Sequence, residues 1–273
     1  MKRWIVQACL VAGACGVVLA CGGGDDDDGG AGATGSGGAA GDGTGGAVVG
    51  GTAGIGGTAG VGGTGPGDCV GAIVFADAAL ESAVRAAVGV SSGDITAGDV
   101  AGLTTLDAST VGISALGGAE CLTALTVLDL GFNDITDASP LAGLTALTEL
   151  NLSNNSITDI GPLSGLTALT VLNLQDNTIG DIAPLSGMTA LVDLDLEMNP
   201  IADFSPLAGL TALDSIDLEG TGITDLTPLA SNTGLTNGDT VLLEGSGIDC
   251  TAQADSIAAL EGRGVVLDGL LCM

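Results

Sequence analysis

Carboxylates dominate the side chains of this chain that could do acid–base or ligand chemistry. Its 273 residues include 33 Asp and Glu residues, no His and no Tyr, and the only Lys is Lys2. A Ser–His–Asp or Cys–His site, a lysine Schiff base and a histidine-ligated metal therefore cannot be assembled. A carboxylate pair could still hydrolyse a glycoside, provided that a pocket surrounds it. We predict a protein that is not an enzyme, with no catalytic residue, no cofactor and no metal site.

Many of the carboxylates recur at fixed intervals. One position holds Asp or Asn in six successive segments, from Asp107 to Asp217 in equal steps, and further acidic residues stand two places before or after it. Because side chains alternate along a strand, these positions would project from one side of a sheet. The candidate binding face is Asp107, Asp129, Glu149, Asp193, Asp195, Glu197, Asp217 and Glu219.

Two interpretations of this face stay open. Its five members from Asp193 to Glu219 should converge on two adjacent strands, where like charges cost stability. Either the exposed positions became acidic for solubility, or the face docks a basic peptide, a basic protein surface or, less favoured, Ca²⁺. Phe132 is the only aromatic residue near the face, and strong interfaces usually have aromatic and Arg anchors. We therefore expect modest, salt-sensitive affinity.

The elements that position these residues come from a 22-residue repeat, which runs five times from Leu122 to Ser231 without insertion or loss. One unit cannot bury its own apolar face, so stacked units must share a core. Two apolar columns alternate at strand spacing and should point into that core. They are Leu128, Leu150, Leu172, Leu194 and Ile216, and Leu130, Leu152, Leu174, Leu196 and Leu218. Weaker copies precede and follow, around Leu106 and, after an insertion at 237–239, around Val241.

Polar columns define the rest of each unit. An Asn column at 133, 155, 177 and 199 should satisfy turn backbone groups, and Thr221 interrupts it, which predicts a looser coil there. A Pro column from Pro140 to Pro228 excludes a regular strand on the return side and favours a turn or a short helix. Asp stands three residues before each Pro, from Asp137 to Asp225, and should cap that turn. We prefer this interpretation to a calcium ladder.

The pattern L-x-x-L-x-L-x-x-N-x-I, followed by I-T-D-x-x-P-L-x-G-L, resembles the leucine-rich repeat family and its 22-residue subtype in bacterial internalins. The resemblance covers about Cys69 to Met273. It implies an α/β leucine-rich-repeat solenoid, with short parallel strands on one face, turns and short helical segments on the other, and helical caps at both ends. We expect an N-terminal cap at 69–99, repeats at 100–250 and a C-terminal cap at 251–273.

The caps can be located from their own patterns. A helix beginning near Phe75 would place Leu80, Val84 and Val88 on one face. A second helix should span 252–263, followed by a closing strand at 264–268. Four cysteines remain for an exported domain, and they allow three pairings; they are Cys69, Cys121, Cys250 and Cys272. Because each pair in sequence order brackets one end of the solenoid, a disulfide at each cap makes physical sense.

The segment before Cys69 has a different character. Residues 1–20 read as a secretory signal, since Met1-Lys2-Arg3 precedes an apolar run. The end of this run, Val18-Leu19-Ala20-Cys21, resembles the lipobox of bacterial lipoproteins, which implies lipidation of Cys21. An ordinary signal peptide or a single span are the alternatives, and Cys15 is a poorer lipidation site. Residues 21–68 are Gly-, Ala- and Asp-rich and predict a flexible tether.

Charge limits the partners. The chain carries a net charge of −29, and beyond the signal only Arg85 and Arg263 are basic. Nucleic acid is therefore excluded as a partner, and attachment to a membrane would come through lipid alone. We predict a lipid-anchored protein of the bacterial cell envelope, with the outer membrane favoured because Gly22 follows Cys21. Its repeats would bind a protein or basic peptide. The alternative is a spacer without a specific ligand. A carboxylate hydrolase comes third, because such a solenoid offers an open face and not a pocket.

Overall fold

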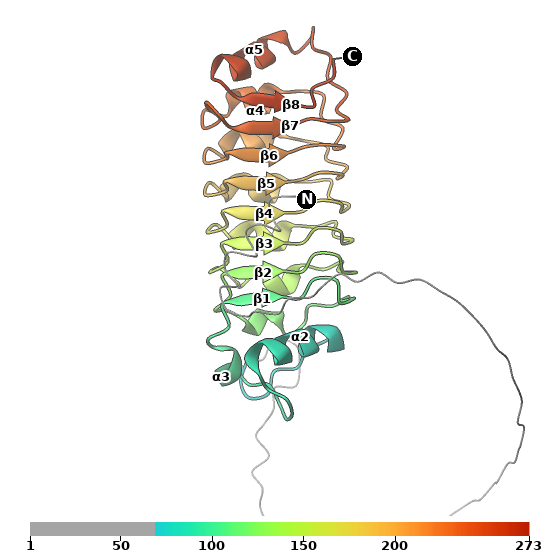
Figure 1. Ribbon diagram of the computed structural model, residues 1–273, viewed down its shortest axis with the longest axis vertical. Coiled ribbons are helices and arrows are strands. Elements are labelled where there is room, and N and C mark those ends of the chain that lie inside the picture. The colour runs from blue at the N-terminus through green and yellow to red at the C-terminus, as the bar shows by residue number, and fades with distance from the viewer. Residues whose placement is uncertain (1–68, 273) are drawn as a thin grey trace, which may run out of the picture. The chain divides into compact units, whose positions relative to one another are not determined.

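Residues 69–272 are described by a computed structural model, in which they form a stack of coils with one strand per coil (Figure 1). The eight strands make a single parallel sheet whose spatial order is the order in sequence. The strands are β1 (Thr105–Asp107), β2 (Val127–Asp129), β3 (Glu149–Asn151), β4 (Val171–Asn173), β5 (Asp193–Asp195), β6 (Ser215–Asp217), β7 (Thr240–Leu242) and β8 (Val266–Asp268). The predicted leucine-rich-repeat solenoid is confirmed. The predicted signal peptide, Cys21 and the predicted tether lie outside the described residues.

The register of the sheet follows the 22-residue period. Leu128 pairs with Leu106 on one side and with Leu150 on the other, so equivalent residues of successive repeats stand side by side. The insertion at 237–239 is absorbed before β7 begins, because Ile216 still pairs with Val241. The weaker copy that follows the insertion therefore keeps its strand.

Both predicted leucine columns are buried, and they form one core that continues from the first coil to the last. From β2 to β7 the centre of each three-residue strand points inward, and the leucine immediately after the strand does the same. Each coil alone would leave these side chains in water, so burial depends on the coils above and below. The sheet is stable because of stacking and not because of strand length.

Short helices occupy the return side, as the proline column predicts. They are η1 (Ala119–Cys121), η2 (Ser139–Leu141), η3 (Gly161–Gly165), η4 (Ala183–Gly187), η5 (Ser205–Gly209) and α4 (Thr227–Ser231). From η2 to α4 a proline stands at the first or second position, where its missing N–H is not needed. The capping aspartates are confirmed: Asp137 Oδ1 accepts a hydrogen bond from the Ser139 N–H at 2.8 Å, and Asp159 does the same for Gly161 at 2.7 Å.

The asparagine column ties neighbouring coils together. The Asn155 side chain donates to the carbonyl of Leu152 in its own coil and of Leu130 in the coil before, and it accepts the Ile135 N–H. Thr221 replaces this amide with a hydroxyl that donates only to Leu218, within its own coil. Thr221 therefore lacks the hydrogen bond to the preceding coil that the asparagines make, and this loss is the physical basis for the looser coil predicted there.

The caps differ from their predicted bounds by a few residues. Helix α2 (Ala78–Val88) begins at Ala78 and not near Phe75, because Asp77 is extended and caps the N–H groups of Ala79 and Leu80. Helix α5 (Ala254–Gly262) is shorter than 252–263, and β8 falls within the predicted closing strand. A one-turn helix, α3 (Ala97–Val100), was not predicted from the sequence. Figure 1 shows α2 and α3 at one end of the stack and α5 at the other.

Disulfides join Cys69 to Cys121 and Cys250 to Cys272. Of the three pairings that the sequence allowed, this one places a covalent link at each cap. Among the described residues, no helix has the length and apolar character needed to cross a bilayer.

Candidate functional site

The outward face of the sheet carries the candidate residues. The last residue of each strand points away from the core, and in register order this position reads Asp107, Asp129, Asn151, Asn173, Asp195 and Asp217. The structure places Asp195 beside Asp217 on β5 and β6, with Glu197 and Glu219 two residues beyond each strand. We call Asp195, Glu197, Asp217 and Glu219 the acidic cluster.

The remaining candidates are spread over the other strands. Asp107 and Asp129 pair on β1 and β2, and two asparagine-bearing strands separate them from the acidic cluster. Glu149 lies on β3 between Val127 and Val171. Asp193 begins β5, opposite Ser215. The face is therefore not uniformly acidic, because its carboxylates concentrate at β5 and β6.

Two acidic residues near the cluster were missed in the sequence. Glu244 follows β7 as Glu219 follows β6, and Asp268 ends β8 beside Leu242. Repulsion from Asp217, Glu244 and Asp268 adds to burial in raising the pKa of Glu219. The signal was present but displaced, because the insertion at 237–239 breaks the 22-residue step. Extending the outward columns past Val241 to Glu244, and past Leu267 to Asp268, would have revealed both.

The aspartates of this column also have a local structural role. Asp195 accepts a hydrogen bond from the Glu197 N–H at 3.1 Å, and Asp217 accepts one from the Glu219 N–H at 2.9 Å. Asn173 does the same for the N–H of Gln175 at 2.9 Å. Each side chain thus supports the bend at which the chain leaves the strand. An amide serves as well as a carboxylate here, so the bend does not require the negative charge.

Amides relieve some of the carboxylates but not the centre of the cluster. Asn151 donates to Asp129 at 2.9 Å, and Gln175 makes a short hydrogen bond to Glu197. Asp195 and Asp217 stand side by side at the same register position. One oxygen each from Asp195, Glu197 and Asp217 lies within 4.8 Å of the others, a spacing that would also admit a cation. Ca²⁺ takes about six to eight oxygens, so most of its shell would have to come from elsewhere.

Burial and mutual repulsion change the acidity of these groups. Burial and the neighbouring Asp217 raise the pKa of Asp195 from 3.8 to about 7. Burial likewise raises the pKa of Asp217, Glu197 and, farther along the sheet, Asp129. A carboxylate removed from water and placed beside another favours the protonated form. At neutral pH the Asp195 carboxyl therefore retains proton occupancy that an isolated aspartate would lack.

Basic side chains are remote from this face. The arginines of residues 69–272 are Arg85 in α2 and Arg263 directly after α5. Arg85 forms an ion pair with Glu81 at 2.6 Å, and Arg263 donates to carbonyls at the end of α4, including that of Asn232 at 2.6 Å. Both guanidinium groups stabilise caps, which leaves the charge of the acidic cluster uncompensated by any arginine of the described chain.

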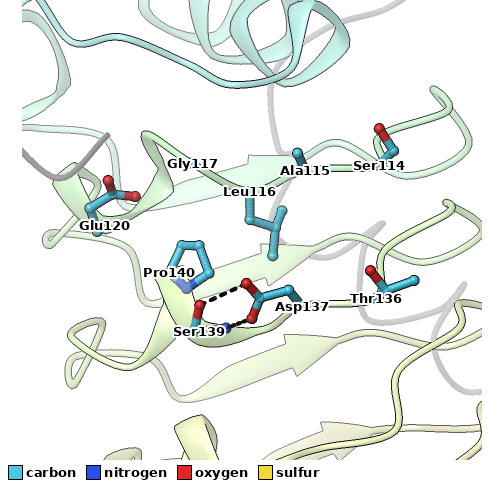
Figure 2. Close-up of a pocket in the computed structure, with 9 residues that line it drawn as sticks. All are labelled: Ser114, Ala115, Leu116, Gly117, Glu120, Thr136, Asp137, Ser139 and Pro140. Atoms are coloured by element: carbon cyan, nitrogen blue, oxygen red, sulfur yellow. Dashed lines mark hydrogen bonds between the residues drawn. The ribbon is translucent and has the colours of Figure 1, made fainter. Parts of the chain in front are cut away.

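A pocket lies apart from the acidic cluster, where the return side meets the N-terminal cap (Figure 2). Its volume is about 630 Å³, and its lining is Ser114, Ala115, Leu116, Gly117, Glu120, Thr136, Asp137, Ser139 and Pro140. Figure 2 shows Asp137 turned to Ser139, to which both of its oxygens are bonded. Glu120 accepts the N–H of Gly118. These carboxylates are held by their own turns, and the pocket includes no residue of the strand face.

Comparison with known proteins agrees with this geometry. A family model described as leucine-rich repeats in two copies matches residues 145–187, and one described as a leucine-rich repeat matches 121–139. No curated protein matches the sequence significantly. The chain is similar to the crystal structure of an internalin C2 from Listeria monocytogenes, with 34% identity and a TM-score of 0.63 over 72% of this chain and 88% of that one.

A second internalin structure from Listeria monocytogenes is 32% identical, with a TM-score of 0.66. The match covers 71% of this chain but 56% of the other, so this chain spans little more than half the length of that relative. In both cases the shared part is large enough to contain the repeats.

Proposed function

Because this chain belongs to the leucine-rich repeat family and its repeats are of the internalin type, we propose that residues 69–272 form a non-catalytic module that binds a basic segment of another protein. Stacked repeats present an extended surface to which many strands contribute, and this suits an extended partner. The observation that carries the proposal is the acidic cluster on the outward face of β5 and β6, which no arginine of the described residues compensates.

A basic partner would supply the missing counter-charge. Its Lys or Arg side chain would favour the ionised form of Asp195 and Asp217, and binding would release the proton that Asp195 retains in the absence of a partner. Attraction between exposed charges speeds association and weakens with salt. We therefore propose rapid, salt-sensitive binding of modest affinity.

We further propose that lipid on Cys21 anchors the module in the bacterial cell envelope, at the outer membrane. The support is the sequence alone: the apolar run before Val18-Leu19-Ala20-Cys21, and Gly22 directly after the cysteine. Residues 21–68 would give the module reach from the membrane surface.

The binding proposal is tested with a charge-neutralised face. Asp195→Asn with Asp217→Asn keeps the bends, since asparagine already fills this position at 151 and 173. In the full-length protein, this pair should weaken binding of a lysine–serine peptide and flatten its dependence on salt. Asp137→Asn with Asp159→Asn removes the same charge from the return side and should leave binding unchanged. Equal binding by all three proteins would contradict the proposal.

A calcium titration by calorimetry belongs in the same experiment. If the wild type gives a heat of Ca²⁺ binding that the Asp195/Asp217 variant lacks, and the peptide does not bind, the face is a metal site and not a peptide site. Peptide binding that Ca²⁺ leaves unaffected supports the proposal.

A spacer without a ligand is the second candidate, and one observation favours it. Asp195 and Asp217 each accept a backbone N–H, so their presence has a structural explanation that needs no partner. Under this alternative the charge serves solubility. The asparagine variant separates the two candidates, because it keeps the structural role and removes the charge.

A further inference from the structure

The exposed apolar side chains of the repeats gather on one edge of the stack. Seven large apolar residues of the described chain are exposed, and four of them belong to the caps or the segments beside them: Val70, Val74, Val266 and Leu271. The other three are Val111, Phe132 and Met198. All three lie at the bend where a coil leaves its strand, shortly beyond the end of β1, β2 or β5. We call this bend, repeated along the stack, the exit edge.

The backbone at the exit edge makes Phe132 and Met198 unusual. Equivalent residues of successive coils all have left-handed backbone, with φ of 59° at Thr110, 56° at Phe132, 54° at Asn154, 51° at Asp176 and 56° at Met198. The next coil has Gly220 at φ 63°. Asn, Asp and Gly suit this conformation, whereas bulky side chains adopt it rarely. Phe132 and Met198 are thus unfavourable on two counts, since each is also 57% exposed.

Met198 borders the acidic cluster, and Phe132 follows the strand that ends in Asp129. Met198 directly follows Glu197, and its N–H donates to the Glu219 carbonyl at 2.9 Å. Its thioether lies over Gly220, so that a Cβ there would meet the sulfur at 2.5 Å. Phe132 occupies the same place three coils earlier, about 14 Å away at the usual strand spacing of about 4.8 Å. An extended chain covers that distance in about four residues.

We propose that Phe132 and Met198 are the apolar anchors of the candidate binding face, and that the partner is an extended basic segment with two apolar side chains four positions apart. This inference rests on the proposed function and specifies its partner. The even spacing puts both apolar side chains on one side of the segment, so they reach the exit edge together. Lysines or arginines of the segment lie against the carboxylates that border this edge, including Asp176 and Glu197. Charge complementarity selects the segment, and the apolar pair fixes its register.

The test uses two peptides and a matched pair of variants in the full-length protein. One peptide is lysine-rich with leucines at positions i and i+4, and the other has serine in place of both leucines. Phe132→Gly with Met198→Gly removes the anchors and replaces them with glycine, the residue at the equivalent position 220. The control, Thr110→Gly with Asn154→Gly, changes the same backbone positions without removing an apolar side chain.

The anchor variant should bind the leucine peptide about tenfold more weakly than the wild type, and the serine peptide equally well. The control should bind both peptides as the wild type does. Thermal unfolding of the anchor variant should stay level or rise, because glycine relieves the left-handed backbone. If the variant with both glycines has a lower melting temperature than the wild type, a second variant takes its place, Phe132→Asn with Met198→Asn. Asparagine is the residue found at the equivalent position 154, and the same binding result is expected of this variant.

The other outcomes overturn the inference in distinguishable ways. If the leucine peptide binds wild type and anchor variant equally while Asp195→Asn with Asp217→Asn weakens both peptides, the anchors are refuted and the proposed function stands. If neither peptide binds the wild type, the proposed function and the inference both fail. If the control loses binding as much as the anchor variant, backbone conformation and not apolar contact is responsible, and the inference is again refuted.

Discussion

At the scale of single residues, Asp195 both stabilises and destabilises the folded protein. Its side chain supports the bend after β5 through the Glu197 N–H, while its neighbour Asp217 repels it. The equivalent positions at the ends of β3 and β4 hold asparagine, which accepts the same backbone hydrogen bond without a charge. Aspartate at 195 therefore weakens the folded protein as the pH rises to about 7, a cost that asparagine at this position would avoid.

This conflict predicts a pH dependence of stability. The pKa of Asp195 is raised from 3.8 to about 7 on folding, so the folded state holds the proton more tightly than the unfolded state does. Its stabilising contribution is complete below 3.8 and is lost as the pH rises through about 7. The free energy of unfolding should thus fall between about pH 5 and about pH 8, and Asp195→Asn should reduce that fall. Urea denaturation at the two pH values measures it.

Asp137→Asn is the control for this measurement. Hydrogen bonds from Ser139 lower the pKa of Asp137, so its contribution is present above 3.8 and lost only at lower pH. The control variant should be destabilised to a similar extent at both pH values. An Asp195→Asn protein with the same pH dependence as the wild type would show that the Asp195 carboxylate is ionised throughout this range.

At the scale of elements, one coil is too small to be stable alone. In each coil, three strand residues and a short helix surround a few leucines, and only the adjacent coils complete the burial of these leucines. Stability of such a stack is a sum of coil terms and interfaces between neighbours. The amide of Asn155 adds a polar link across one interface, and the hydroxyl of Thr221 leaves its interface without that link.

Leu172→Ala tests this dependence on neighbours in the central coil. Leu172 is buried in β4 between Leu150 and Leu194, so truncation should leave a cavity that costs about 2–5 kcal/mol of unfolding free energy. Val171→Ala, at the outward-facing position beside it, should cost much less. Chemical denaturation of both variants makes the comparison, and equal effects would mean that the apolar columns have been assigned to the wrong face.

At the scale of the whole molecule, the described domain separates its charges. Both arginines of residues 69–272 bind within the caps, and disulfides close the same two ends. The open ends of a solenoid core need cover, and these links supply it. The sheet between the caps is then free to carry an excess of carboxylates, because its stability comes from the leucine core behind it.

The proposed anchor makes a separate prediction at this scale. Replacement of Cys21 by Ser in the full-length protein should abolish metabolic labelling with a fatty-acid analogue and release the protein from the membrane fraction. Cys15→Ser, which changes the poorer site, should leave labelling intact. Labelling that survives in Cys21→Ser and disappears in Cys15→Ser would reassign the lipidated residue, and labelling of neither wild type nor variants would refute the anchor.

The sequence determined the architecture because this fold is local and periodic. The 22-residue period brings Leu128 beside Leu150 whatever the rest of the chain does, so the sheet, its register and its buried columns could be predicted. The prolines and capping aspartates could be predicted for the same reason, since each acts within its own turn. The helix ends could be predicted only to within a few residues, because caps such as Asp77 act over single residues.

Tertiary structure decided what depends on distances between side chains. The sequence placed Asp195 and Asp217 on adjacent strands, but burial and their contact set the raised pKa. It allowed three disulfide pairings, and the packing of the caps selected one. Glu244 and Asp268 lie near the acidic cluster because the insertion at 237–239 is accommodated before β7 begins, which keeps the register of β7 and β8. The residue types of Phe132 and Met198 do not predict their left-handed backbone, because these types rarely adopt it. Only the equivalent positions of other coils, Asn154, Asp176 and Gly220, favour it, and the geometry of the stacked bends imposes it on every member of the column.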